Sequence, residues 1–426
     1  MMKVLWHLAQ CFMLATLGVA QVVSAAEPAT TGQSAAQSGS QGAKPGDNPG
    51  AGGSLVIIGG ALRTDNAVVW QKIVSLAGGK GARIAVFPSA SGNPQQAGDK
   101  LAATLMQYGA EAFVVPLSVK FKDIDYKQVA QDAAWADKVR SAGGVYFAGG
   151  DQGRITQALV AADGSKTPLL QAVWQVYEKG GVIAGSSAGA AIMSSTMFYD
   201  AMPVLPTLQQ GVTDGKEIAP GLGFIGTDVF IDQHAIIRGR FARMLPVMVK
   251  NNYKLGLGVD ENTAMVVRQR RELEVIGYKG VVMLDLSGAS TDPKQPAFNL
   301  VNARISYLDS GDQLNLQTKA VTPAKDKLAG KLDPAKPYYS APRFFGDILG
   351  NTAVVDMLQD LIDNSQKEVL ALAFGQTGGA FEFRFAKTAE SVGYYSGASG
   401  AESTTVLNVR MDVRPVQMAQ PLYRVP

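Results

Sequence analysis

Residues 181–193 read Gly-Val-Ile-Ala-Gly-Ser-Ser-Ala-Gly-Ala-Ala-Ile-Met: an apolar run, a G-x-S-x-G segment centred on Ser187, and a run of small residues. This order predicts a buried strand, a sharp turn and a helix, an arrangement known as a nucleophile elbow. Small residues flank the serine because such a turn is tight and strained. The elbow would expose the Ser187 hydroxyl above the edge of a sheet and direct backbone N–H groups toward an oxyanion.

Short apolar runs recur on the N-terminal side of the elbow and alternate with stretches of helical spacing. The apolar runs are 55–58, 83–87, 111–115 and 144–148, and the helical stretches are 66–76, 94–108, 126–141 and 169–179. Continuous apolar runs are typical of strands buried on both faces of a parallel sheet. The alternation predicts a doubly wound, mostly parallel α/β sheet of the flavodoxin or class I amidotransferase type. Ligands bind such sheets at the carboxyl ends of the strands.

The N-terminal residues have the features of an export signal. Lys3 precedes a mostly apolar stretch, and small residues at 23–25 predict signal cleavage near Ala25 or Ala26. A membrane anchor that is retained is the alternative. The only cysteine of the chain, Cys11, lies in this segment, so the mature protein would have no thiolate nucleophile, disulfide or cysteine metal site. The formal net charge of +3 gives no case for nucleic-acid binding.

Composition divides the remaining chain into a linker, a main domain and an extension. Residues 26–53 are rich in Ala, Gly, Ser, Gln and Pro and predict a flexible linker. We expect residues 54–322 to form the α/β domain, with an antiparallel extension from strands at 263–267, 272–277 and 298–308. Residues 323–426 would be a β-rich C-terminal extension of unknown role, which could form a small appended domain. Its expected parts are a connector at 323–342, a helix at 344–363 and a strand pair at 368–385.

A serine nucleophile needs a base, and the composition restricts the choice. The chain has two histidines, and His7 lies in the predicted signal segment. His234 would therefore be the only histidine of the mature protein, and it ends an apolar run that begins at Val229. We interpret His234 as the base for Ser187; a purely structural histidine is the alternative.

A catalytic triad also needs a group that orients the imidazole. Asp232 is two residues before His234 and would face the same side of a strand. Glu261, in the polar cluster that follows the apolar run 257–259, is the favoured candidate. A solvated acidic turn is the alternative for this cluster.

Two further motifs follow expected strand ends. Arg238, Arg240 and Arg243 would suit a site that grips carboxylates, although a solvated basic helix face is the alternative. The paired glycines 149–150 let backbone N–H groups approach a ligand closely. Gly150 and Ala188 are thus the candidate donors of an oxyanion hole, and Gln152 would face the substrate; an ordinary glycine turn is the alternative.

Together these motifs resemble the cyanophycinases, in the serine peptidase family that also holds aspartyl dipeptidase (peptidase E). The resembling segments, in the family's order between about residues 54 and 308, are 55–60, 147–152, 180–190, 232–240 with Arg243, and 258–264. The resemblance implies that Ser187 is the nucleophile, His234 the base and Glu261 the third member of a triad. It also implies a substrate-binding pocket, formed by Gln152, Asp232, Gln233, Arg238, Arg240 and Arg243.

The resemblance further implies a substrate, the polymer cyanophycin, which is a poly-aspartate backbone with arginine amide-linked to each side chain. The products would be β-aspartyl-arginine dipeptides, the enzyme would use no metal or cofactor, and it would tend to form a homodimer. A secreted enzyme without a stable membrane anchor would suit a polymer outside the cell. The alternatives are a related aspartyl or isoaspartyl peptidase and a non-catalytic secreted binding protein on the same scaffold.

Overall fold

The computed structural model describes residues 52–375, 379–398, 400, 402–419 and 421. All of them belong to one compact unit. The predicted signal segment, and the predicted linker up to residue 51, lie outside the described residues. None of the helices in the described part of the chain combines the length and the apolar character that a membrane span requires.

The predicted doubly wound sheet is present. Within the described residues the first sheet has nine strands, in the order β15 (Val321–Thr322), β14 (Gln313–Asn315), β11 (Glu272–Gly277), β10 (Thr263–Arg268), β1 (Ser54–Ile58), β5 (Val182–Ser186), β4 (Gly144–Phe147), β2 (Arg83–Phe87) and β3 (Glu111–Val114). The strands β1, β5, β4, β2 and β3 are parallel. The strands from β10 to β15 extend the sheet in antiparallel fashion. The predicted fold class is confirmed.

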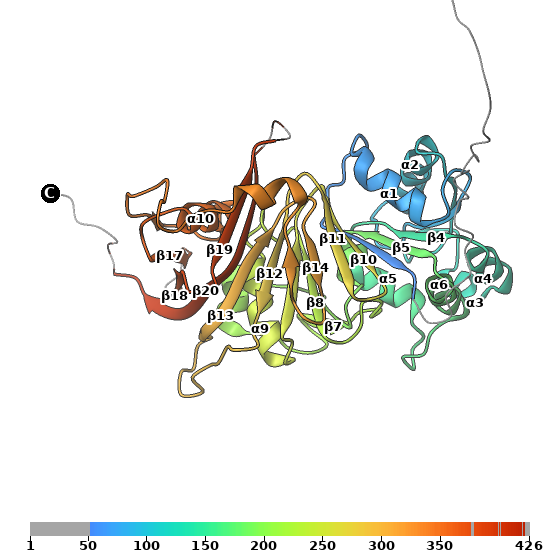
Figure 1. Ribbon diagram of the computed structural model, residues 1–426. Helices are drawn as coiled ribbons and strands as arrows, with labels where there is room; N and C mark the ends of the chain where they lie inside the picture. Colours follow the sequence, from blue (N-terminus) through green and yellow to red (C-terminus); the bar gives the residue numbers. More distant parts are fainter. Residues whose placement is uncertain (1–51, 376–378, 399, 401, 420, 422–426) are drawn as a thin grey trace, which may run out of the picture. The chain divides into compact units, whose positions relative to one another are not determined.

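Helices cover both faces of the parallel strands, because the strand residues alternate between two apolar clusters. Leu55 and Ile57 pack with the helices of one face, which are α3 (Tyr126–Gln131), α4 (Ala133–Arg140), α5 (Gln152–Leu159) and α6 (Pro168–Glu178). Val56 and Ile58 pack with α1 (Ala67–Leu76) and α2 (Pro94–Gln107) on the other. Figure 1 shows these helices grouped around the parallel strands.

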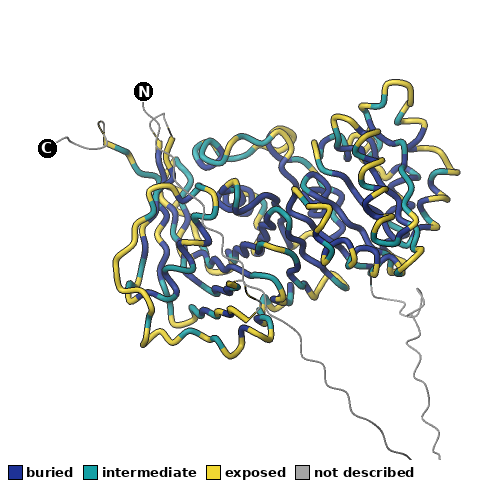
Figure 2. Tube along the Cα trace, turned by 90° about the horizontal axis from the view of Figure 1, so that it is seen from above, coloured by how far each residue is buried: buried dark blue, intermediate teal, exposed yellow. Residues whose placement is uncertain are grey.

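A second, largely antiparallel sheet holds the remaining long strands. Its order is β16 (Phe344–Phe345), β17 (Glu368–Phe374), β18 (Gly379–Ala386), β20 (Ser403–Gln417), β13 (Leu300–Leu308), β12 (Val281–Asp285), β9 (Leu255–Val259) and β8 (Val229–Gln233), with β19 (Val392–Ser396) paired to β20. One face packs on β10 and β11, since Ile231 and Leu257 share an apolar cluster with Met265 and Val275. The helices α9 (Phe241–Lys250) and α10 (Ala353–Ile362) cover the other face. Figure 2 shows the buried interior that results.

A smaller unit connects the two sheets. It consists of β6 (Thr196–Phe198), α8 (Val204–Gln210) and β7 (Ile218–Pro220), and it follows the short helix α7 (Ala188–Ala191). The helix predicted at 126–141 is interrupted at Asp132, whose backbone is extended with φ −73° and ψ 119°. The Asp132 carboxylate accepts a hydrogen bond from the N–H of Trp135 and so begins α4 as a new helix.

The C-terminal residues differ most from the sequence expectation. The helix expected from residue 344 begins only at Ala353, because Phe344 and Phe345 pair with β17. The strand β20, which the sequence patterns did not predict, pairs with both β13 and β18. The extension therefore continues the second sheet instead of forming a sheet of its own. The domain boundary at residue 322 stays a prediction.

The expected connector at 323–342 is also anchored. It contains the 3₁₀ helix η1 (Lys325–Gly330), whose Lys327 side chain is fully buried. Its Nζ lies 2.8 Å from Asp312 Oδ1 and donates to Thr405 Oγ1 at 3.0 Å. A buried ammonium requires such partners, and here they lie near β14 and within β20.

Candidate active site

The turn between β5 and α7 places Ser187 in a strained conformation. Ser187 has φ 54° and ψ −107°, a region that residues other than glycine rarely adopt. The flanking glycines are required, since a Cβ at Gly185 would lie 2.2 Å from the Gly189 carbonyl oxygen. The N–H of Ser187 donates to the Ile58 carbonyl oxygen at 2.9 Å, which fixes the turn to β1. The local structure is the one that the G-x-S-x-G segment predicts.

His234 extends from the end of β8 toward this serine. Its Nε2 lies 2.9 Å from Ser187 Oγ, so one side chain from each sheet meets at this point. The N–H of His234 donates to the Gly59 carbonyl oxygen at 3.0 Å. The ring lies against Gly60, where a Cβ would be 2.2 Å from His234 Cε1. The close approach of β1 and β8 therefore depends on a glycine at position 60.

Glu261 completes a continuous hydrogen-bonded chain. It lies in the turn between β9 and β10, and its Oε1 is 2.6 Å from His234 Nδ1. The Asp232 carboxylate makes no such hydrogen bond to the imidazole, because it is buried and binds Arg243 instead. Of the two sequence candidates for the group that orients the imidazole, Glu261 is thus the one that contacts it.

The environment of His234 favours its neutral form. Burial lowers the pKa of the imidazole, and the nearby guanidinium groups of Arg238 and Arg240 lower it further. The hydrogen bond to Glu261 raises the pKa but does not outweigh burial. A neutral imidazole that faces a serine hydroxyl can accept its proton.

The three arginines that follow His234 have different surroundings. Arg243 is buried, and its Nε and Nη2 bind the two oxygens of Asp232 at 2.7 and 2.8 Å. Its guanidinium also lies 4.0 Å from the centre of the Phe198 ring. Asp232 and Arg243 are therefore bound to each other, and the cation of Arg243 is already matched.

Arg240 and Arg238 are more available than Arg243 to bind a ligand. Arg240 Nη1 donates to Gln233 Oε1 at 2.8 Å and to the Gln233 backbone carbonyl at 3.2 Å. Burial, with Arg243 nearby, lowers the pKa of Arg240 to about 10. Arg238 is half exposed and lies 3.6 Å from Glu261 Oε1. Neither guanidinium has a bidentate carboxylate partner among the described residues.

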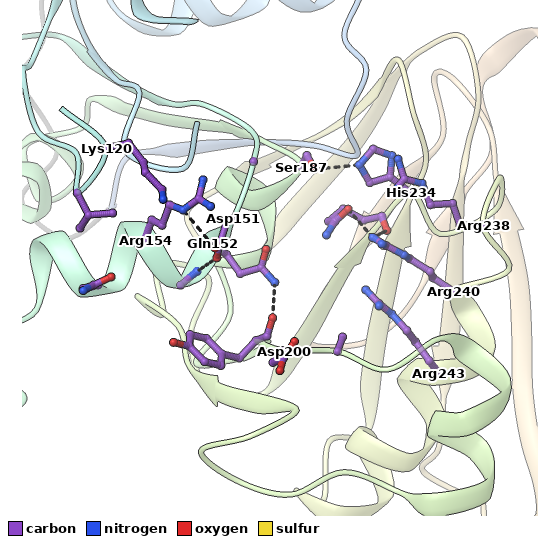
Figure 3. Close-up of a pocket in the computed structure, with 17 residues that line it drawn as sticks. Lys120, Asp151, Gln152, Arg154, Ser187, Asp200, His234, Arg238, Arg240 and Arg243 are labelled. Atoms are coloured by element: carbon purple, nitrogen blue, oxygen red, sulfur yellow. Dashed lines mark hydrogen bonds and ion pairs between the residues drawn. The ribbon is translucent and has the colours of Figure 1, made fainter. Parts of the chain in front are cut away.

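A cavity of about 700 Å³ opens beside Ser187 and His234 (Figure 3). Predicted site residues that line it are Gly150, Gln152, Ser187, Gln233, His234, Arg238, Arg240 and Arg243. The sequence reasoning missed several other charged or aromatic side chains on its walls, namely Lys120, Asp151, Arg154, Tyr199 and Asp200. Lys120 follows the carboxyl end of β3, and that position could have indicated it. Tyr199 and Asp200 follow β6, a strand of three residues that is too short to give a recognisable sequence pattern.

The predicted oxyanion donors lie next to the elbow. Gly150 has φ +141°, and a Cβ there would lie 2.2 Å from the Ala90 carbonyl oxygen, so the turn requires glycine. Among the described residues, none accepts a hydrogen bond from the N–H of Gly150 or of Ala188. Gln152 lines the cavity, and its Nε2 already donates to the Phe198 carbonyl oxygen at 2.7 Å. The roles of these three residues stay predictions.

Comparison with known proteins identifies the family. Residues 55–275 match the family model described as Peptidase family S51, and this segment includes Ser187, His234 and Glu261. The chain belongs to peptidase family S51. Curated relatives of this S51 chain include a protein named "Cyanophycinase" from Geminocystis herdmanii, 30% identical over 279 residues, which are 62% of this chain and 94% of the relative. A second "Cyanophycinase", from Trichormus variabilis, is 28% identical over 286 residues, or 65% and 90% of the two chains.

A solved peptidase from an acI-B1 Actinobacterium is 20% identical, with a TM-score of 0.47 over 63% of this chain and 98% of that one. The family match confirms the resemblance seen in the sequence and the prediction of a serine-type peptidase. The match ends before β12, so the C-terminal strands lie beyond it.

Proposed function

We propose that this chain is a secreted peptidase that hydrolyses cyanophycin to β-aspartyl-arginine dipeptides through an acyl-enzyme on Ser187. The observation that carries the proposal is a continuous chain of hydrogen bonds through three side chains. Ser187 Oγ lies 2.9 Å from His234 Nε2, and His234 Nδ1 lies 2.6 Å from Glu261 Oε1. The Ser187–His234 end of this chain opens onto a cavity lined by several cationic side chains. The curated relatives named "Cyanophycinase" support the choice of substrate.

In the first half of the reaction, Ser187 Oγ attacks the backbone carbonyl carbon of an aspartyl residue while His234 Nε2 accepts the hydroxyl proton. Glu261 holds the Nδ1–H of the ring and stabilises the imidazolium. The N–H groups of Gly150 and Ala188 are the proposed donors to the tetrahedral oxyanion. The C–N bond then breaks, His234 gives its proton to the leaving amine, and an ester remains on Ser187.

In the second half, water attacks the ester carbonyl and His234 accepts one of its protons. The C–O bond to Ser187 then breaks, and His234 returns the proton to Oγ. The lowered pKa of His234 keeps the imidazole neutral for both proton-accepting steps.

The charges of the cavity suit the chemistry of cyanophycin. Each arginine of the polymer is joined through its α-amino group, so it keeps a free carboxylate as well as a guanidinium. The guanidinium of Arg240, which has no acidic partner among the described residues within 4.0 Å, is the proposed partner for a substrate carboxylate. Arg238 supports it from the rim of the cavity.

The test uses purified protein on a suspension of insoluble cyanophycin. We expect the turbidity to clear and chromatography to show β-aspartyl-arginine without free arginine, because the isopeptide link is not the bond attacked. Ser187→Ala is the matched inactive control. Absence of clearing, together with hydrolysis of small aspartyl or isoaspartyl peptides, would instead identify the related peptidase activity.

Secretion has a separate test. A bacterial host that expresses the full chain should release activity into the periplasm or the culture fluid, and N-terminal sequencing of that protein should begin near residue 26. Activity confined to the cytoplasm with an intact N-terminus would contradict secretion without affecting the proposed chemistry.

A further inference from the structure

The cavity has an excess of cations, and two carboxylates, those of Asp151 and Asp200, line it. The Asp151 carboxylate accepts the N–H of Gly153 at 2.9 Å and lies 3.3 Å from Arg154 Nε. Asp200 differs, because among the described residues no lysine or arginine nitrogen lies within 4.0 Å of its carboxylate. It is the lining carboxylate that remains available for a substrate cation.

An aromatic ring accompanies this carboxylate. Tyr199 lines the same cavity, and 47% of the residue is exposed, although large hydrophobic side chains are usually buried. A guanidinium binds well where it can pair with a carboxylate and stack on an aromatic face, because it is planar and weakly hydrated. We call Tyr199 and Asp200 the Tyr–Asp corner.

The backbone of the Tyr–Asp corner is held in place. Gln152 Nε2 donates to the Phe198 carbonyl oxygen at 2.7 Å, immediately before the corner. The N–H groups of Tyr199 and Asp200 donate to the carbonyl oxygens of Glu217 and Lys216. The absence of a side chain at Gly153 also matters, since a Cβ there would lie 2.4 Å from the Tyr199 ring. These contacts give Gln152 a supporting role that does not require direct contact with the substrate.

We propose that the Tyr–Asp corner binds the guanidinium of a substrate arginine, while Arg240 binds the carboxylate of the polymer. Figure 3 shows Asp200 apart from the Ser187–His234 pair. The two charges of one arginyl unit would thus be bound at separate points, so the cavity selects a zwitterionic side chain and rejects one with a carboxylate alone. This inference rests on the proposed function and specifies the recognition group of that same site.

The test compares two soluble β-aspartyl oligomers, one carrying arginine and one carrying citrulline, which has nearly the same shape without the positive charge. We expect wild-type protein to hydrolyse the arginine oligomer with a kcat/KM about 10- to 150-fold higher than that for the citrulline oligomer. This is the range that corresponds to one hydrogen bond to a charged group. Asp200→Asn should lower kcat/KM on the arginine oligomer by a similar factor and leave the citrulline oligomer nearly unchanged. Tyr199→Leu should lower the arginine value by about 2- to 5-fold.

Asp214→Asn is the matched control, because Asp214 is an exposed acid of the same segment that does not line the cavity and pairs with Lys250 at 3.1 Å. It should leave both substrates unchanged. An equal loss on both oligomers in Asp200→Asn, or no loss on either, would overturn the inference while the proposed function stands.

Binding provides a readout that does not depend on hydrolysis. In a Ser187→Ala background, titration calorimetry should show tighter binding of the arginine oligomer than of the citrulline oligomer, and Asp200→Asn should remove the difference. If wild-type protein cleaves neither oligomer, the proposed function fails. In that case the calorimetric result decides the inference. The inference then fails if the protein shows no preference for the arginine oligomer, or if the preference survives Asp200→Asn.

Discussion

The two walls of the cavity differ in how their polar side chains are satisfied. On the wall that carries His234, the polar groups mostly bind one another: Ser187, His234 and Glu261 form one hydrogen-bonded series, and Asp232 and Arg243 form a buried pair. On the opposite wall, Lys120 and Asp200 are exposed and have no charged partner within 4.0 Å among the described residues. Groups that must hold a fixed geometry for bond breaking are held by the protein, whereas groups that recognise charge are left for the substrate.

The same difference divides the three arginines. Arg243 is matched by Asp232 and stacks on Phe198, so it contributes to the structure of the wall. Arg240 and Arg238 carry charge that the protein does not fully neutralise. Substitutions should therefore separate effects on catalysis, on folding and on binding.

The largest expected effect is on Ser187. Ser187→Ala should lower kcat on the order of 10⁶-fold while the protein keeps its fold, because only the nucleophilic oxygen is lost. His234→Ala should cost a similar factor, and the double variant should be little worse, since the two act as a unit. Single-turnover rates on a β-aspartyl-arginine oligomer measure this. If the rate losses of the two single variants multiplied in the double variant, Ser187 and His234 would not share a mechanism.

Arg243→Gln should act mainly on stability. It leaves the Asp232 carboxylate buried without its cation, which typically costs about 3–5 kcal/mol of the free energy of unfolding. Urea unfolding followed by circular dichroism measures it. The double variant Asp232→Asn/Arg243→Gln should recover part of the loss. An unchanged midpoint in Arg243→Gln would show that the pair is not a structural element.

Arg240→Gln should act mainly on substrate binding and catalysis. Loss of one charge-assisted contact of roughly 1.5–3 kcal/mol corresponds to about a 10- to 150-fold fall in kcat/KM. Arg240→Lys should restore little, because an ammonium cannot form the planar fork. The unfolding midpoint should stay close to that of the wild type. Near wild-type kcat/KM in both variants would exclude Arg240 as a carboxylate partner.

The smallest expected effect is a shift in a pH profile. The acid limb of kcat/KM should follow a single titration below the ordinary histidine pKa, because burial lowers the pKa of His234 and the neutral form is active. The Arg238 cation also lowers this pKa. Arg238→Gln should therefore raise it and move the acid limb to higher pH. A limb that stays in place, or moves to lower pH, would contradict this assignment of charges.

Sequence alone predicted the elements with strong local signals. The parallel strands and the elbow could be found because each strand is a continuous apolar run and the glycines of the turn cannot be replaced. The pairing of Ser187 with His234 followed from elimination, since His7 lies in the predicted signal segment. Glu261 was favoured over Asp232 because it lies in a polar cluster after an apolar run, the family resemblance implied the same residue, and in the structure Glu261 is the residue that contacts the imidazole.

The rest depends on contacts between distant residues. The sequence did not show that β8 and β9 belong to a second sheet, because an apolar strand has the same pattern in either sheet. β20 could not be expected at the centre of that sheet, since its partner β13 lies about a hundred residues earlier. The Tyr–Asp corner was missed for the same reason: Gln152 and Gly153 hold it in place from another element.

Labelling with a fluorophosphonate tests the central claim most directly, because the reagent reacts with an activated serine. The account predicts one label per chain, on the peptide that contains Ser187, with loss of hydrolysis in proportion to labelling. A β-aspartyl-arginine oligomer should slow the reaction, and His234→Ala should prevent it. Labelling at another serine, or full hydrolysis of cyanophycin by protein labelled at Ser187, would contradict the account.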